Sequence, residues 1–254
     1  MSKAPAVDYA LAIVEYLSEC GAAVGISDIS NALGINKNAV SRVLDALCAQ
    51  HWIYAAADDP KKYRLTLKPF ALMANAVDDR ALLKIAAPVL EQLRPQVQDA
   101  MYLGVRSDDR VLYLLHYDSC REVRVGGRVG GRYALHTSAP GKVLLAHDSD
   151  AEIRAYFQRQ SASGADAFLP EAVRIRAQGY AQDREEFCRG IVCVAVPVYD
   201  AQHRVAAAIG VSGVTLYDTA DSLMQHPYPL LHRAAAQISA SLGDRTGEID
   251  YGKV

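Results

Sequence analysis

The chain has 254 residues, of which 51% are hydrophobic, and its formal net charge at pH 7 is −2. This length allows one large domain or two ordinary ones, and the apolar content excludes a mainly disordered chain. The net charge does not indicate that the protein binds nucleic acid. Any DNA-binding surface must therefore come from local placement of cations. Five cysteines without a Cys-x-x-Cys pair argue against a disulfide framework, and the absence of a signal-peptide pattern or a bilayer-length apolar run predicts a cytoplasmic protein with no membrane partner.

The first fifty residues predict three helices. Apolar residues at helical spacing predict a first helix that ends near Gly21. The stretch ISDISNALG predicts a second helix with Ser27 as N-cap and Gly34 as its stop, and INKNAVSRVLDALCAQ predicts a third helix capped by Asn36. Two short helices joined by a tight glycine turn, the second with a polar outer face, predict a helix-turn-helix.

The polar face of the third helix has chemistry suited to DNA. Arg42 can read guanine through two hydrogen bonds, Asn38 can read adenine, and Ser41 can meet a base or a phosphate. Lys37 lies on the same face. The alternative is an ordinary solvated helix face, because polar outer faces are the rule.

The next stretch, WIYAAADDPKKYRLTL, favours the DNA-binding interpretation. It predicts a strand, a turn at Asp58-Asp59-Pro60 and a second strand, with Lys61, Lys62 and Arg64 clustered beyond the turn. A basic hairpin directly after a helix-turn-helix is a wing, whose cations would lie against phosphates. We therefore predict that double-stranded DNA binds to this segment.

The remainder of the chain predicts a second domain. The stretch from Lys68 to Ala100 is helical in pattern, broken at Asp78-Asp79, and MYLGVRSDDRVLYLLHYDS then predicts two strands. The segment EVRVGGRVGGRYALH predicts a third strand with two Gly-Gly pairs. Further helices are expected at about 138–158, 170–178 and 219–242, with two buried strands in GIVCVAVPVYD and HRVAAAIGVSGV. This order predicts an α+β fold with an antiparallel sheet.

The stretch LHTSAPGKVLLAH looks at first like a phosphate-binding loop. That motif needs a glycine five residues before the Gly-Lys pair and a hydroxyl residue after it, but His136 and Val143 occupy these positions. What remains is a helix start that Thr137 or Ser138 can cap and that could attract a carboxylate. Lys142 is expected to point outward to solvent. An ordinary capped helix is the alternative.

The chain resembles the IclR family of bacterial transcription regulators over nearly its whole length. The resemblance rests on NKNAVSRVLDAL with the wing ending in YRL, on VGGRYALHTSAPGKVLLA, on GYAQDREEFCRGIVCVAVPVYD and on VAAAIGVSGV. It implies a winged helix-turn-helix in residues 1–68, a linker helix in 69–83 and a GAF-like (profilin-like) effector domain in 84–243, followed by a polar tail in 244–254. It also implies a homodimer or homotetramer on a palindromic operator, with no cofactor.

The resemblance further implies where a small-molecule effector binds. Carried over position by position, it points to a pocket between the loop before Gly-Lys and two strands, with an apolar wall and a hydroxyl and a thiol for orientation. The implied effector-binding residues are Val125, Ala139, Pro140, Gly141, Asp183, Ile191, Cys193, Gly210 and Ser212. A small organic acid, aromatic or not, would fit such a pocket. Two departures from the family's pattern are Pro140, which removes one N–H donor, and Thr66, where glycine is common.

Two other kinds of function are weighed against a ligand-controlled regulator. Cys193, His136 and Asp183 could form a thiol–imidazole–carboxylate triad, but Cys193 lies in an apolar strand rather than in the electropositive setting that a nucleophile needs. The histidines show no metal-ligand spacing. The second domain could alternatively serve oligomerisation only.

Overall fold

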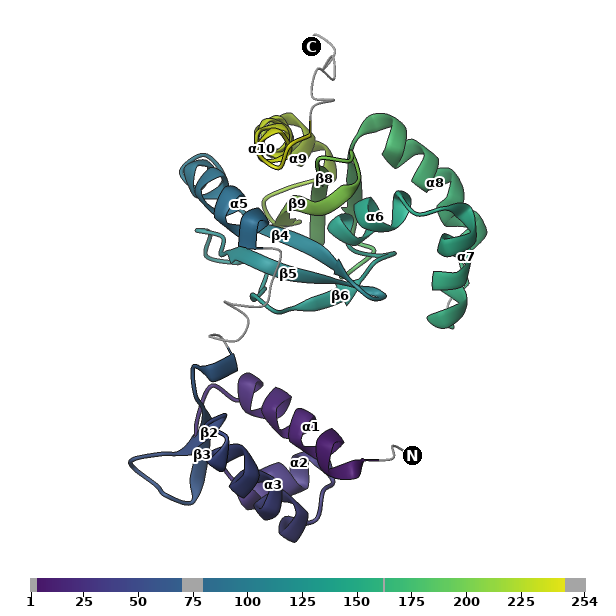
Figure 1. Ribbon diagram of the computed structural model, residues 1–254. Coiled ribbons are helices and arrows are strands. Elements are labelled where there is room, and N and C mark those ends of the chain that lie inside the picture. The colour runs from purple at the N-terminus through teal and green to yellow at the C-terminus, as the bar shows by residue number, and fades with distance from the viewer. Residues whose placement is uncertain (1–3, 70–79, 162, 245–254) are drawn as a thin grey trace. The chain divides into compact units, whose positions relative to one another are not determined.

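The computed structural model describes residues 4–69, 80–161 and 163–244, and the chain divides into two compact units, Met1–Asp78 and Asp79–Val254 (Figure 1). The boundaries predicted from the sequence stay predictions. Most of the predicted linker helix, residues 70–79, lies outside the described residues, and so do residues 245–254 of the predicted tail.

The first unit is a small helical domain with a three-stranded antiparallel sheet. Its helices are α1 (Pro5–Glu19), α2 (Ile26–Leu33) and α3 (Lys37–Ala49), which confirms the three predicted helices. Its strands β1 (Val24–Gly25), β2 (Ile53–Ala55) and β3 (Lys62–Leu65) lie in the order β1-β3-β2. The helices pack through one apolar core, whose fully buried members are Ile13, Ile29, Val40 and Leu44. The hairpin β2–β3 is the predicted wing.

The turn between α2 and α3 has the local chemistry that the sequence indicates. Gly34 ends α2 in the left-handed conformation, with φ +67°, where glycine avoids the steric cost of a side chain. The Asn36 side chain caps α3 by accepting a hydrogen bond from the Ala39 N–H at 2.9 Å. The predicted cap of α2 is wrong: α2 begins after Gly25, whose N–H donates to the Asp28 carboxylate at 3.2 Å, so Ser27 lies inside the helix.

The second unit is built on a six-stranded antiparallel sheet, which confirms the predicted α+β class. The strand order is β6-β5-β4-β9-β8-β7. The strands are β4 (Ala100–Ser107), β5 (Arg110–Tyr117), β6 (Arg132–Ala134), β7 (Ala181–Arg184), β8 (Ile191–Tyr199) and β9 (Val205–Val214). The helices are α5 (Arg80–Leu93), α6 (Ala139–Ala146), α7 (Asp150–Arg159), α8 (Ala165–Gln178), α9 (Ala220–Gln225) and α10 (Pro227–Ser241).

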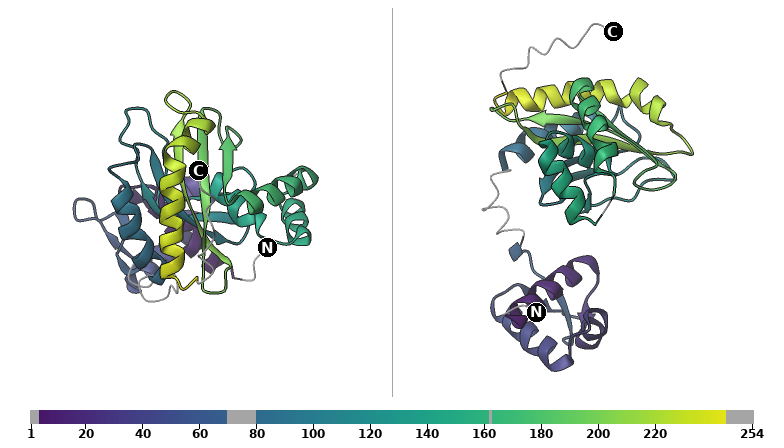
Figure 2. Two further views of the ribbon diagram at one scale, coloured as in Figure 1. Left: turned by 90° about the horizontal axis from the view of Figure 1, so that it is seen from above. Right: turned by 90° about the vertical axis from the view of Figure 1, so that its right-hand side faces the viewer.

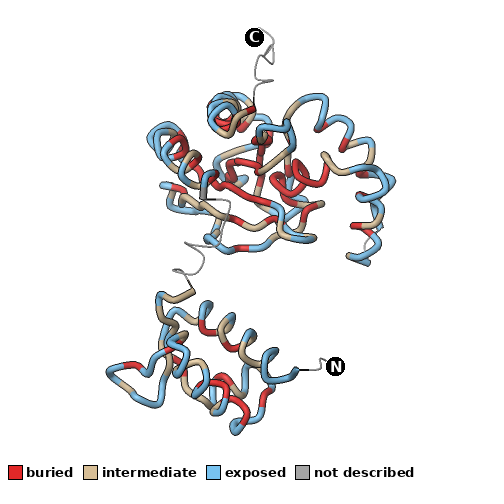
Figure 3. The backbone as a smooth tube through the Cα atoms, in the orientation of Figure 1, coloured by how far each residue is buried: buried red, intermediate tan, exposed pale blue. Residues whose placement is uncertain are grey.

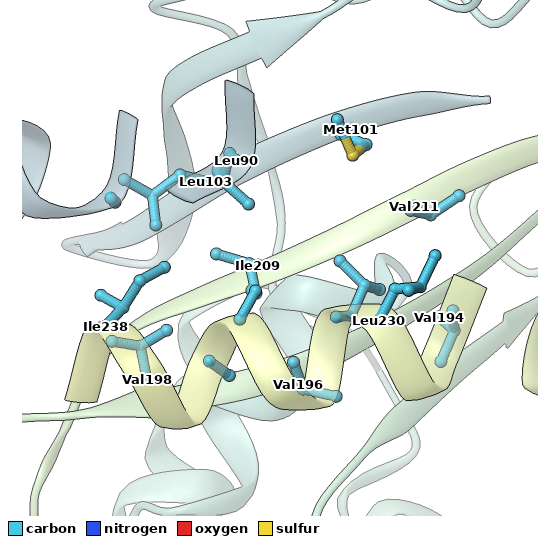
Figure 4. Close-up of a cluster of buried hydrophobic side chains, with 14 of the residues drawn as sticks. Leu90, Met101, Leu103, Val194, Val196, Val198, Ile209, Val211, Leu230 and Ile238 are labelled. Carbon is cyan, nitrogen blue, oxygen red and sulfur yellow. The ribbon is translucent and has the colours of Figure 1, made fainter. Parts of the chain in front are cut away.

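Helices cover both faces of this sheet (Figures 1 and 2). Helices α5 and α10 cover one face, where aliphatic side chains from both helices and from β4, β8 and β9 interdigitate (Figure 4). Helices α6, α7 and α8 belong to the core of the other face. Because β8 and β9 are buried on both sides, their sequences are almost continuously apolar rather than alternating.

Several element boundaries differ from those that the pattern predicts. In the segment predicted as a third strand only β6 is extended, and the part with both Gly-Gly pairs is a loop, since glycines pay a large entropic cost in a regular strand. The helix expected at 138–158 is interrupted before Ser149, which caps α7 with Glu152 in a capping box. The helix expected at 219–242 is split before Pro227, which lacks an N–H. The short strand β7 was not predicted.

Helix α6 is buried along its whole length (Figure 3). Its close approach to Leu135, the residue that follows β6, depends on Gly141. A Cβ atom at this position would lie 2.5 Å from the Leu135 Cα and 2.6 Å from the Leu135 carbonyl oxygen, which are backbone atoms that cannot rotate away. Gly141 therefore has a packing role.

We expect Gly141→Ala to destabilise the second unit by about 1–3 kcal/mol, because overpacking a tight core forces a backbone shift. Gly126→Ala is the matched control, since a Cβ there would meet nothing within 4 Å. Chemical denaturation of both full-length variants measures the difference. Equal stabilities would contradict the packing role of Gly141.

Candidate functional site

The polar residues predicted to contact DNA lie on α3 and on the wing. On α3, Lys37, Asn38 and Arg42 are exposed and Ser41 is half-buried, while Ala39, Val40 and Val43 face the core. The spacing of the four polar residues places them on one side of the helix. The outer side of α3 is thus free of the core and carries two cations.

The wing carries the other predicted cations. Lys61, Lys62 and Arg64 are all exposed, and Lys62 and Arg64 alternate along β3 with the half-buried Tyr63 and Leu65. Lys62 lies 3.9 Å from Asp59, in an exposed ion pair that contributes little to stability.

The base of the wing is connected to the end of α3 by Thr66, whose hydroxyl donates a hydrogen bond to the His51 carbonyl at 2.7 Å. The departure at Thr66 therefore adds a local hydrogen bond.

In the second unit, strand register brings the predicted polar residues into one row. Asp183 on β7 pairs with Cys193 on β8, Cys193 pairs with Ser212 on β9, and Ser212 pairs with Ala100 on β4. Residues paired in this way point to the same face of a sheet. This is the face that α6 covers, so residues distant in sequence meet below the start of that helix.

A cavity of about 30 Å³ lies over this row, which is room for one or two water molecules. Six of the nine predicted effector-binding residues line it: Val125, Pro140, Asp183, Ile191, Cys193 and Ser212. The other three do not. Ala139 belongs to the apolar core, Gly141 packs on Leu135, and Gly210 makes room for the ring of Tyr102, which would lie 2.5 Å from a Cβ there.

Aromatic side chains that the sequence analysis missed form another wall of the cavity. Tyr102 stacks on Tyr113 with ring centroids 4.6 Å apart, Tyr113 contacts Tyr133 at the same separation, and Tyr133 meets Phe187 edge-on at 5.5 Å. Tyr133 comes from the edge strand β6 and Phe187 follows the opposite edge strand, β7. The sheet therefore curls until aromatic rings from its two edges meet. For Tyr102 the available signal was its place on β4 two residues after Ala100, since side chains two apart in a strand share a face.

The cavity's polar groups are mostly hydrogen-bonded to one another. The Ser212 hydroxyl donates to the Tyr102 hydroxyl at 3.1 Å and lies 2.9 Å from the Cys193 sulfur. One oxygen of Asp183 accepts from the backbone N–H groups of Glu186 and Phe187, at 2.7 and 3.1 Å. The other oxygen, Oδ2, is buried and accepts no hydrogen bond. Burial raises the pKa of the Asp183 carboxyl, against the effect of the two N–H groups.

Lys142 lies beside the cavity, and the expectation that it points to solvent is wrong. Its side chain is 0% exposed, and its ammonium group donates to Glu171 on α8 at 3.0 Å, to the Gln182 carbonyl on β7 at 3.2 Å and to Glu186. The packing of α6 on β7 and α8 forces this orientation, because Lys142 lies on the covered side of a wholly buried helix. Its positive charge is balanced by the carboxylates of Glu171 and Glu186.

The geometry does not support a catalytic triad. Burial raises the pKa of the Cys193 thiol to about 12, so that the nucleophilic thiolate is suppressed at neutral pH. The third member of the triad, His136, does not line the cavity and pairs its Nδ1 with the Tyr156 hydroxyl at 2.7 Å. Within the described ranges, no group of three His, Cys, Asp or Glu side chains could hold a metal ion. In the same ranges, no helix is long and apolar enough to cross a membrane.

Family models match both units of the chain. The model of the IclR helix-turn-helix domain matches residues 6–55, and the model described as bacterial transcriptional regulator IclR C-terminal matches residues 74–240. The transcriptional regulator KdgR of Escherichia coli is 31% identical over 228 residues, covering 87% of this chain and 86% of that one. KdgR of Dickeya chrysanthemi is 32% identical over 229 residues, covering 87% and 74%. Both relatives are named as regulators, not as enzymes.

Solved structures agree with this assignment. An IclR transcriptional regulator from Alicyclobacillus acidocaldarius superposes with a TM-score of 0.77 at 25% identity, covering 95% of this chain and 100% of that one. An IclR homologue from Microbacterium hydrocarbonoxydans, solved with 4-hydroxybenzoate, has the same fold, with a TM-score of 0.79 at 20% identity and coverages of 93% and 98%. With a winged helix-turn-helix at one end, a cavity-bearing domain at the other and family models matching both, the chain belongs to the IclR family of bacterial transcriptional regulators.

Proposed function

We propose that this regulator binds a palindromic operator as a homodimer or homotetramer in the cytoplasm, and that a small organic acid in the second-unit cavity controls its affinity for DNA. The observation that carries the proposal is the row of Asp183, Cys193 and Ser212 beneath the start of α6. Apolar and aromatic walls with a few convergent polar groups are typical of small-molecule sites. The related structure with 4-hydroxybenzoate supports an acid as the ligand class.

The cavity must widen for such a ligand, because about 30 Å³ does not hold an organic acid. The proposed opening lies at the contact between Tyr133 and Phe187, where Phe187 is 40% exposed. Displacing Phe187 moves the segment that donates two N–H groups to Asp183. A ligand can shift the equilibrium between two conformations only if it binds them with different affinities. In this proposal the two conformations differ in the position of the segment that contains Glu186 and Phe187.

Apolar residues on the walls argue against a nucleotide or another highly charged effector. None of the described residues lining the cavity is a lysine or arginine, and the neighbouring Lys142 is already paired with two glutamates. Phosphate groups would therefore be desolvated without counter-charges. A monocarboxylate carries a single negative charge, so its burial needs far less compensation by counter-charges.

On the DNA side, we expect Arg42→Ala to cost about 1–3 kcal/mol on the specific site and to relax preference at one base pair. The double change of Lys61 and Lys62 to Ala should instead weaken all DNA about equally, since these cations are proposed to contact phosphates. Binding titrations with operator and with scrambled duplex at several salt concentrations separate the two effects. If Arg42→Ala kept full sequence preference, α3 would not be the recognition helix.

On the ligand side, we expect Ser212→Ala to lower effector affinity by about 1 kcal/mol or more, because a polar group of the ligand loses its partner. Calorimetric titration of both proteins measures the change, and operator should alter effector affinity by the same factor as effector alters operator affinity. The first step is a thermal-shift screen with small organic acids. If no acid stabilises the protein, the second unit serves assembly rather than sensing.

A further inference from the structure

We propose that Glu186 is an electrostatic latch that keeps the cavity closed while no effector is bound. Lys142 pairs with Glu186 in the closed state alone and with Glu171 in both the closed and the open state. This inference rests on the opening proposed above at Phe187 and identifies the contact that regulates it. The latch sets the fraction of molecules with an open cavity, and therefore the effector concentration to which the regulator responds.

Three kinds of contact hold Glu186 and Phe187 in the closed position. Their backbone N–H groups donate to Asp183 at 2.7 and 3.1 Å, and the Phe187 ring meets the Tyr133 ring edge-on at 5.5 Å. The third contact is the ion pair between the Glu186 carboxylate and the Lys142 ammonium group. Asp183 and Tyr133 line the cavity, so a bound ligand can replace their contacts. The ion pair lies beside the cavity, and opening has to break it.

The residue before Glu186 has a strained backbone in the closed conformation. Glu185 has φ +68°, in the left-handed region that is unfavourable for residues with a Cβ atom. Its N–H donates to the Ile191 carbonyl at 3.1 Å, and its carboxylate accepts from the Gly190 N–H at 2.8 Å, which closes the turn between β7 and β8. A movement of Glu186 and Phe187 allows Glu185 to leave the left-handed region. The strain therefore favours opening, and the ion pair of Glu186 opposes it.

The charges around Lys142 allow opening without leaving a buried cation unpaired. In the closed state the ammonium group contacts the carboxylate of Glu171 at 3.0 Å, the carboxylate of Glu186, and the Gln182 carbonyl at 3.2 Å. When Glu186 moves away, Lys142 and Glu171 remain as a pair with one charge of each sign. A buried charge that loses its counter-charge is strongly unfavourable, and Glu171 avoids this cost. The Glu186 side chain, already 45% exposed, becomes fully hydrated in exchange.

The two glutamates therefore have opposite effects on opening. Without the Glu186 charge, the closed state loses an ion pair while the pairing in the open state is unchanged, so opening becomes easier. Without the Glu171 charge, Lys142 keeps Glu186 as its carboxylate partner, so opening leaves a buried cation without a counter-charge and becomes harder. A purely structural role of this cluster would give both substitutions the same sign, because each removes one ion pair from the same lysine.

The test needs no effector, because alkylation of Cys193 reports on opening. Cys193 lines the cavity and is 6% exposed, so iodoacetamide reaches its thiol when the cavity opens. Peptide mass spectrometry of the full-length protein at pH 8 gives the alkylation rate of Cys193 separately from the rates of the exposed Cys120 and Cys188. Glu186→Gln should raise the Cys193 rate by about three- to tenfold, and Glu171→Gln should lower it by a similar factor, as expected for one hydrogen-bonded ion pair.

Glu91→Gln is the matched control, because Glu91 forms an exposed ion pair with Arg94 on α5, which covers the other face of the sheet. Its Cys193 rate should equal that of the wild type. Loss of a negative charge also makes a nearby thiol more acidic, but this effect has the same sign for Glu171 and Glu186 and cannot produce opposite changes.

Two results would overturn the latch: an unchanged rate in Glu186→Gln, or changes of the same sign in Glu186→Gln and Glu171→Gln. The first criterion holds even if Glu171→Gln fails to fold, since Glu186→Gln leaves Lys142 paired with Glu171. Either result would leave the proposed function intact. That function fails on a different measurement, in which no small organic acid stabilises the wild type.

Discussion

The buried ammonium group of Lys142 constrains much of the second unit. A lysine removed from water needs acceptors on every side, and here they come from α8, from the backbone of β7 and from the segment after β7. Helix α6 can satisfy this requirement in only one orientation, which places its first turn over the sheet. Gly141 permits the same placement from the other side by letting the helix approach Leu135. The position of the cavity under the start of α6 therefore depends on the neutralisation of the Lys142 charge in the same helix.

Antiparallel register supplies the other half of the site. A shift of one residue between β8 and β9 would turn Ser212 to the opposite face, where α5 and α10 form an aliphatic core. Backbone pairing thus brings the Ser212 hydroxyl, the Cys193 thiol and the Asp183 carboxyl group together, and the contact of 2.9 Å between Ser212 and Cys193 adds to it. Because backbone pairing sets the register of the sheet, a side chain that lines the cavity can change without a change in that register.

The fold and the first unit could be predicted from the sequence because their signals are local. Gly34, Asn36 and the apolar stripe of α3 report helix ends and faces directly, and the hairpin is marked by its turn. The site was predictable only in part. Tyr133 and Phe187 meet at the cavity through a curl of the sheet that brings its two edges together, and no periodicity in a single strand encodes such a curl. Lys142 was assigned to solvent because a charged residue is seldom fully buried, and its acceptors lie 29 and more positions away.

The lengths of the outer strands have a consequence for the behaviour of the protein in concentrated solution. Strand β6 has three residues and β7 has four, whereas the inner strands have eight to ten. A short edge strand exposes few unpaired backbone N–H and C=O groups. Charged residues on these strands, such as Arg132 and Arg184, also disfavour the pairing of a strand from another molecule with the sheet edge. Association of this domain with another copy is therefore expected to use side-chain surfaces rather than the pairing of edge strands, which would lead to fibrils.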